Sequence, residues 1–174
     1  AGFAAALLEK TEPVNLAQLF RSLIGMPEAE VLDRFHPALG LLQLWIEPAE
    51  TLNYGRGWLA GESERPLHLV MTAGLLDAYT PKNTQAALAA AYGLPLIEPV
   101  AEAWPVLDLL DIPASPSPAQ GNRRDARGRA LTAGVLQYPD EGHFAVFTDA
   151  SAQEAYRRFF ETLRQGIPVA LVGP

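Results

Sequence analysis

The chain carries LHLVMTAGLLDAYTP over residues 67–81, and this segment predicts a buried β-strand followed by a loop. Residues 67–73 form a short, nearly continuous apolar run, which is typical of a strand covered on both faces of a parallel sheet. Gly74 ends the strand, and Asp77 lies in the loop that follows. Helical spacing of apolar residues then predicts a helix over 83–92.

A second strand and a second helix are predicted near the carboxyl end. Residues 129–138 form the strand candidate, His143 follows it, and residues 150–165 have an amphipathic helical pattern. Residues 95–128 are rich in proline with little periodicity apart from residues 106–110, so we expect a long surface loop there with one turn of helix. Strands that alternate with helices indicate an α/β fold with a parallel sheet.

Two parallel strands alone do not make a stable sheet, because small sheets are marginal and parallel ones need helices on both faces. We therefore expect the chain to fold against another segment, either the N-terminal half of the same gene product or a partner chain. The sequence starts at Ala1 without Met, in the middle of an apolar segment. This start suggests a cut chain, or a mature exported chain after signal cleavage.

The N-terminal third is predicted to be helical. Residues 15–24 have helical apolar spacing, and the helical pattern of residues 27–58 is interrupted by Pro37 and Pro48. We expect three parts, described here by their ranges: a joining segment (1–12), a helical lid or cap (13–60) and the C-terminal half of the core (61–174).

Composition excludes several partners. The 174 residues carry a formal charge of −7 with a pI near 4.9, which argues against nucleic acid and anionic membrane surfaces. No apolar segment is long enough to span a bilayer, and the absence of cysteine leaves the compartment open. The one basic cluster is interpreted as a solvated loop; its members are Arg123, Arg124, Arg127 and Arg129.

Asp77 and His143 are the candidate catalytic residues. Each follows a predicted strand, and the carboxyl ends of parallel strands are where α/β sheets bind ligands. A carboxylate that orients a histidine lets the histidine take a proton from a serine hydroxyl. The alternative is structural: Asp77 would cap the helix after Pro81, and His143 would be a loop histidine satisfied by backbone.

The spacing G-x-x-D-x-x-T-P at residues 74–81, followed by Gly-His-Phe at residues 142–144 and a helix, resembles the C-terminal half of an α/β-hydrolase. More narrowly, it is similar to bacterial esterase/lipase-like members. The resemblance implies that Asp77 is the triad acid, that His143 is the triad histidine, and that residues 13–60 lie where the family inserts a lid.

The nucleophile of such an enzyme has no counterpart in the chain. A G-x-S-x-G elbow should precede the acid and the histidine, and none occurs. The nearest approach, at Ser63, lacks the closing glycine and precedes a strand instead of following one. The first strands and the oxyanion-hole loop of the family are also absent.

Other constellations are weaker. Glu30, Asp33 and His36 have helical spacing, but such a set more often lies on a solvent-exposed helix face than in a metal site. No glycine-rich phosphate loop occurs, so a nucleotide cofactor is not supported, and we expect neither a cofactor nor a metal. Aromatic residues could line an acyl or alcohol pocket, although buried aromatics more often belong to a core; they are Trp45, Trp58, Tyr79 and Trp104.

The sequence thus predicts the C-terminal portion of a serine hydrolase that cleaves small apolar carboxylic esters, with the serine on a separate or cleaved N-terminal segment. A peptidase or a dehalogenase-like enzyme would use the same acid and histidine. The alternative is a non-catalytic interaction module that keeps hydrolase-like topology and binds a partner through residues 13–60.

Overall fold

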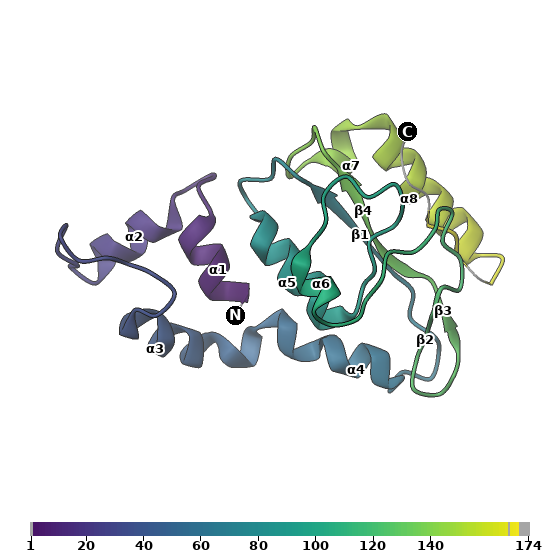
Figure 1. The fold of residues 1–174 in the computed structure, drawn as a ribbon, viewed down its shortest axis with the longest axis horizontal. Helices are drawn as coiled ribbons and strands as arrows, with labels where there is room; N and C mark the ends of the chain where they lie inside the picture. Colours follow the sequence, from purple (N-terminus) through teal and green to yellow (C-terminus); the bar gives the residue numbers. More distant parts are fainter. Residues whose placement is uncertain (1, 167, 171–174) are drawn as a thin grey trace.

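The chain is a mixed α/β protein with a small parallel sheet, which confirms the predicted class at that level. A computed structural model describes residues 2–166 and 168–170. Figure 1 shows the sheet between α5 and α6 on one side and α8 on the other, with α1, α2 and α3 extending away from it. Within the described residues, no helix is long and apolar enough to cross a membrane.

The elements follow one another along the chain as helices, strands and short 3₁₀ turns (η). They are α1 (Gly2–Glu9), α2 (Leu16–Leu23), α3 (Pro37–Ile46), η1 (Glu47–Ala49), η2 (Thr51–Tyr54), α4 (Gly55–Ala60), β1 (Leu69–Gly74), α5 (Lys82–Tyr92), α6 (Pro105–Asp108), β2 (Arg123–Arg124), β3 (Ala130–Leu131), β4 (Ala133–Tyr138), α7 (Ala145–Thr148) and α8 (Ala150–Leu163). The predicted strand over 67–73 and the helices over 83–92 and 150–165 therefore correspond to β1, α5 and α8.

Strands β1 and β4 pair in parallel, in a register that runs from Leu69 opposite Ala133 to Gly74 opposite Tyr138. On its other edge, β4 bonds to residues 95–97: Ile97 N–H donates to Val135 O at 2.9 Å. All six residues of β4 are buried, whereas only the last two of β1 are. Among the described residues, β1 is thus an edge strand.

Two apolar cores lie on the two faces of the sheet. On one face, Ala73 and Val135 pack with Ala89 of α5 and Leu107 of α6. On the other face, Leu136 packs with residues of α8. Because successive side chains of a strand point to opposite faces, the continuous apolar runs of β1 and β4 supply both cores.

The turn of helix predicted within residues 95–128 corresponds to α6, but the prediction that this segment runs over the surface was wrong. Ile97 is fully buried, and Trp104 and Leu107 are 3% and 2% exposed. Proline hid this contribution, because the segment reaches the core through a two-residue bridge and one helical turn, and neither is long enough to have a periodicity.

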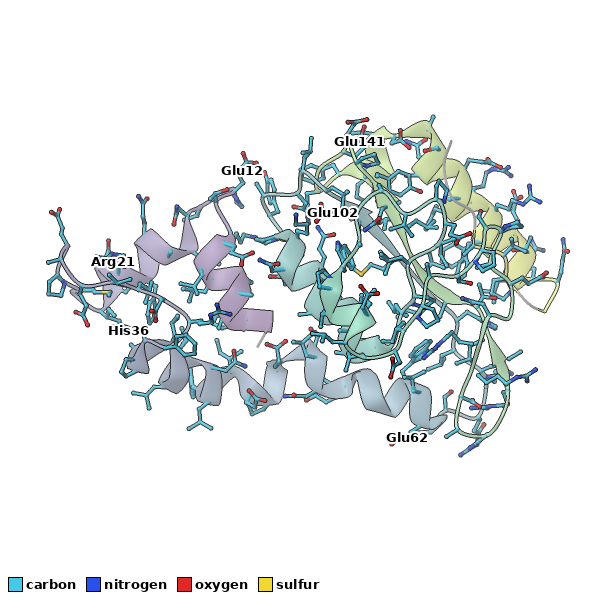
Figure 2. The ribbon with its side chains drawn as sticks, viewed as in Figure 1. Glu12, Arg21, His36, Glu62, Glu102 and Glu141 are labelled. Atoms are coloured by element: carbon cyan, nitrogen blue, oxygen red, sulfur yellow. The ribbon has the colours of Figure 1, made fainter. Side chains whose placement is uncertain are left out.

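The N-terminal helices follow the prediction in part. Pro37 does not interrupt a helix but starts α3, where His36 Nδ1 accepts a hydrogen bond from Ala38 N–H at 3.2 Å and caps it. The residues between α2 and α3 are not helical; Arg21 donates to three of their carbonyls. We call α2, α3 and the residues between them the N-terminal arm. Figure 2 shows Arg21 and His36 in this arm, far from the sheet.

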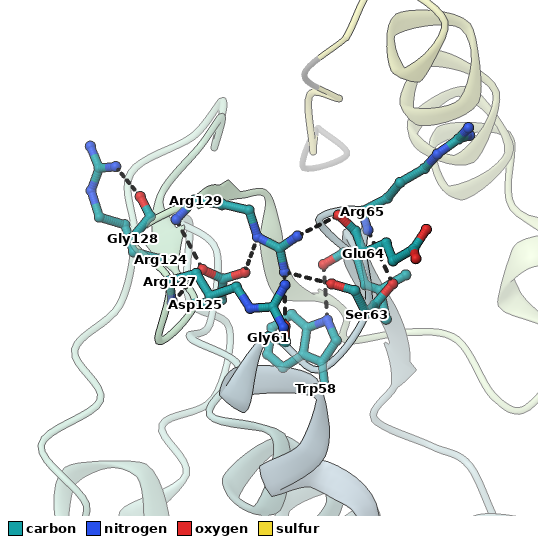
Figure 3. Close-up of polar contacts among 11 residues, drawn as sticks. Trp58, Gly61, Ser63, Glu64, Arg65, Arg124, Asp125, Arg127, Gly128 and Arg129 are labelled. Atoms are coloured by element: carbon teal, nitrogen blue, oxygen red, sulfur yellow. Dashed lines mark hydrogen bonds and ion pairs between the residues drawn. The ribbon is translucent and has the colours of Figure 1, made fainter.

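The interpretation of the arginine cluster as a solvated loop was wrong for Arg129. Its Nε donates to the buried carboxylate of Asp125 at 2.6 Å (Figure 3). Its two other nitrogens donate to carbonyls that precede β1, those of Gly61, Ser63 and Glu64. Burial raises the pKa of Asp125, but hydrogen bonds and the positive charge from Arg129 outweigh burial and lower it. Arg129 therefore joins the β2–β3 hairpin to the segment that leads into β1.

We expect Arg129→Met to lower the melting temperature by several degrees, because it leaves the Asp125 carboxylate buried without its cation and frees three carbonyls. Arg129→Lys should recover only part of the loss, since one ammonium does not reproduce the guanidinium fork. Arg164→Met, a change of an arginine without such a network, is the control. Thermal unfolding measures the effect, and equal melting temperatures for Arg129→Met and the control would contradict it.

His68 should make stability depend on pH. Burial lowers the pKa of His68, and its Nδ1 accepts a hydrogen bond from Thr132 N–H at 2.9 Å, so the fold favours the neutral ring. Below about pH 6.5 the unfolded chain takes up a proton that the folded chain resists, so this contribution to stability is lost on acidification. His68→Asn keeps an acceptor but cannot titrate. The free energy of unfolding should therefore fall more for the wild type than for His68→Asn between pH 7.5 and 5.5, as urea titrations would show.

Candidate active site

Asp77 and His143 come together at the carboxyl end of the sheet. Asp77 lies three residues after β1 and His143 five residues after β4. Because the two strands are paired in parallel, their following loops start side by side. His143 Nδ1 lies 3.0 Å from Asp77 Oδ2, across a separation of 66 residues in sequence.

The two oxygens of Asp77 have different partners. Oδ1 accepts backbone N–H bonds from Tyr79 at 2.7 Å and Thr80 at 2.8 Å, and Oδ2 faces His143. The side chain of Asp77 is only 7% exposed. Helix α5 is not capped by Asp77, since its N-cap is Pro81, which makes no side-chain bond. The capping alternative for Asp77 is therefore wrong: its carboxylate closes a loop and holds the imidazole.

His143 has one ring nitrogen bound and one open. Because Asp77 Oδ2 accepts, the proton of the neutral ring is on Nδ1, and Nε2 keeps its lone pair. Nε2 makes no hydrogen bond within the described residues, and the side chain is 39% exposed. A lone pair at a half-exposed Nε2, with a carboxylate on the opposite nitrogen, is the arrangement of a general base.

The loops after the two strands are held together by backbone bonds. Leu75 N–H donates to Tyr138 O at 3.0 Å, and Leu76 N–H donates to Glu141 O at 2.9 Å. Gly74 makes this approach possible, because a Cβ at that position would lie 2.2 Å from Gly142 O. The contact between Asp77 and His143 therefore depends on the lack of a side chain at Gly74, the last residue of β1.

Gln85 is a positioning residue that the sequence did not reveal. It is 3% exposed on α5, and its Nε2 donates to Thr80 O at 2.7 Å and Gly74 O at 3.2 Å. These bonds tie the helix to both ends of the loop that carries Asp77. The sequence offered one sign of this role: Gln85 is a polar residue on the face of an alanine-rich helix that is buried.

A cavity of about 190 Å³ lies beside the pair. It is lined by the outer edge of β1 at Thr72 and Gly74, by both candidate residues, and by Thr80, Gln85 and Gly142. Its position at the strand ends is the usual place for a ligand in an open α/β sheet.

Tyr138, at the end of β4, and Asp149, at the start of α8, have shifted pKa values. Burial raises the pKa of Tyr138 to about 12, and the nearby negative charge of Asp149 adds to this effect. Hydrogen bonds from the Ser151 hydroxyl and from Ala152 N–H lower the pKa of Asp149, which caps α8. At neutral pH Tyr138 is therefore neutral and Asp149 is ionised.

None of the chain's serines is a nucleophile for this histidine in the structure. Ser63 accepts from Arg65 N–H, Ser115 accepts from Asn122, and Ser151 bonds to Asp149. Ser22 and Ser117 make no contact with His143. Each of the five serines is a described residue, so a nucleophilic serine would have to come from elsewhere.

The remaining candidates are placed away from the pair. His36 Nε2 contacts Glu30 at 2.9 Å, whereas Asp33 accepts from Phe35 N–H, and no group of three or more metal-ligating side chains occurs in the described part of the chain. Of the aromatic residues, Trp104 is in the core and Trp45 is 80% exposed. Tyr79, in contrast, stacks on the ring of His143.

Comparison with known proteins adds no relative: no family model, no curated protein and no solved structure matches this chain. What the fold and the site define is therefore a mixed α/β chain with an acid–histidine pair at adjacent strand ends.

Gly74→Ala tests how the pair is held. The added methyl group overlaps Gly142 O, so the loop after β4 should move and the Asp77–His143 contact should be lost. We expect a clear loss of stability and a changed His143 ring signal in NMR spectra. Gly40→Ala is the matched control, because a Cβ there meets nothing within 4 Å, and alanine in a helix should stabilise by about 0.5–1 kcal/mol. Unchanged His143 signals in Gly74→Ala would contradict the conclusion that Gly74 is required for the Asp77–His143 contact.

Proposed function

We propose that this chain is the C-terminal portion of a serine hydrolase of the α/β-hydrolase fold, esterase- or lipase-like, that cleaves carboxylic esters. Asp77 orients His143, and His143 acts as general base and general acid. The serine belongs to an N-terminal segment of the same hydrolase, present as a separate or cleaved chain. The observation that carries the proposal is the Asp77–His143 contact, with an open Nε2 on a histidine that lines a cavity at the strand ends.

The chemistry follows from the open nitrogen. Nε2 removes the proton of the serine hydroxyl as its oxygen attacks the ester carbonyl, and the imidazolium then protonates the leaving alcohol. Water enters by the same route and releases the acid. The buried Asp77 carboxylate stabilises the imidazolium at each step, because its Oδ1 is already held by two backbone N–H groups.

The free edge of β1 supports a partner segment. Leu69 N–H donates to Thr132 O, just before β4, and Leu75 N–H donates to Tyr138 O at its end. The alternate residues Val70 and Thr72 therefore direct their backbone groups to the other side. No described strand pairs there. A groove of about 310 Å³ runs beside this edge, lined by β1 and by aromatic residues of α8 such as Tyr156 and Phe160. A further apolar strand would satisfy the edge and cover the groove.

The N-terminal helices support an apolar substrate. Leu41, Leu44 and Trp45 of α3 are each at least 71% exposed, and Phe35 before it is 81% exposed. Residues 10–12 connect this arm to the site, since Thr11 N–H and Glu12 N–H donate to Ala78 O. A lid that admits an acyl chain would present such an apolar surface, and the exposed side chains of α3, which lie away from the sheet, would have to move toward the catalytic loop to do so.

The same exposed helices favour a second candidate, a non-catalytic module that binds a partner through residues 13–60. In that function the Asp77–His143 contact only stabilises the loops. The two functions make opposite demands on His143, because a binding module does not need its Nε2.

The test uses the complete protein that contains this chain. A fluorophosphonate probe should label a serine outside these residues, and ester hydrolysis should fall by about 10³-fold or more in His143→Ala. Asp77→Asn should cause a large loss as well, because the ring loses its preferred tautomer. Arg164→Met, a change at an exposed residue that lines neither the cavity nor the groove, is the control.

The two candidates separate on these results. A binding module would show no labelled serine, and its His143→Ala variant would keep full affinity for a protein partner. Undiminished hydrolysis in both site variants would overturn the hydrolase proposal.

A further inference from the structure

Tyr79 covers one face of the candidate catalytic imidazole. The rings of Tyr79 and His143 are stacked, with centroids 4.9 Å apart and planes inclined by 15°. Phe144 meets both rings edge-on, at 5.5 Å from Tyr79 and 5.0 Å from His143. The half-exposed imidazole therefore has two aromatic neighbours and one carboxylate.

The position of Tyr79 is itself fixed by the loop and by α1. Its N–H donates to Asp77 Oδ1, so the carboxylate that binds His143 also holds the backbone of the stacking residue. The ammonium of Lys10, just after α1, lies 5.5 Å from the centroid of the Tyr79 ring. Ala78 O accepts hydrogen bonds from the N–H groups of Thr11 and Glu12, so the segment that carries Lys10 also holds the loop after β1.

A single hydrogen bond to Asp77 does not fix an imidazole. It locates Nδ1, but the ring can still tilt about the bond, and the outer histidine torsion has broad wells. A stacked aromatic ring restricts that tilt and fixes the direction of Nε2. The ring face also attracts the positive charge of the imidazolium formed during the reaction.

We propose that Tyr79 is a positioning residue that holds the plane of the His143 ring, so that Nδ1–H faces Asp77 and Nε2 faces the cavity. The phenol hydroxyl has no partner among the described residues, so the ring and not the hydroxyl does this. The consequence for catalysis rests on the proposed function, whereas the effect on the ring does not.

NMR of the imidazole nitrogens in this chain tests the proposal without any substrate. In the neutral state, His143 should show the Nδ1–H tautomer, while His36 and His68 should show Nε2–H, because their Nδ1 atoms accept backbone N–H bonds. The carbon-bound ring protons of His143 should be shifted upfield by the Tyr79 ring. A His143→Gln variant assigns the signals.

Tyr79→Phe and Tyr79→Leu form the matched pair. Phe should retain both the tautomer and the upfield shift, since it keeps the ring. Leu should remove the shift and introduce the Nε2–H tautomer at His143, with the signals of His36 and His68 unchanged as evidence of folding. A Leu variant that keeps the Nδ1–H tautomer would overturn the proposal. Should that variant unfold, the wild type still decides, because a lack of ring-to-ring Overhauser effects between Tyr79 and His143 also overturns it.

Activity of the complete protein separates this inference from the proposed function. Tyr79→Leu should lower kcat with little change in KM, and Tyr79→Phe should restore it. If no serine is labelled in the complete protein, the hydrolase proposal fails, while the tautomer result still reports on Tyr79.

Discussion

The parallel register between β1 and β4 determines where every part of the candidate site begins. It places the loop after Gly74 beside the loop after Tyr138, and two further backbone bonds, from Leu75 and Leu76, continue the pairing past the strands. Gly74 is required because Gly142 O occupies the space of a Cβ. Asp77 and His143 meet as a result of this approach, which explains how residues on different loops form one short contact.

Support for this pairing comes from several directions. α5 and α8 cover the two faces, and Gln85 ties α5 to the loop of Asp77. Arg129 joins the segment before β1 to the hairpin before β4, so both strands enter the sheet from a common anchor. The outer edge of β1 has no such support among the described residues. The candidate site is thus held by hydrogen bonds on the side of β4 and borders the cavity on the outer side of β1.

The strongest sequence signals correspond to the longer elements, in which many successive residues follow one hydrophobic pattern. Residues 67–73 predicted β1 because their nearly continuous apolar run is typical of a strand in a parallel sheet, and α8 was evident from its 3.6-residue period. The short elements were missed for the opposite reason. Residues 95–97 pair with β4 through a single bridge and leave no pattern, and Pro37 was taken as a break although proline is also suited to a first helical turn.

The sequence by itself determined the α/β class, the order of the main elements and the positions of Asp77 and His143 in the loops after two strands, because hydrophobic period and the position of polar residues behind strands are local properties. Only the tertiary structure decided that Asp77 Oδ2 faces His143 Nδ1, that Tyr79 stacks on the imidazole, and that Arg129 is an anchor instead of a solvated residue. These contacts join residues up to 68 positions apart, and their geometry depends on strand register and on the space left by one glycine.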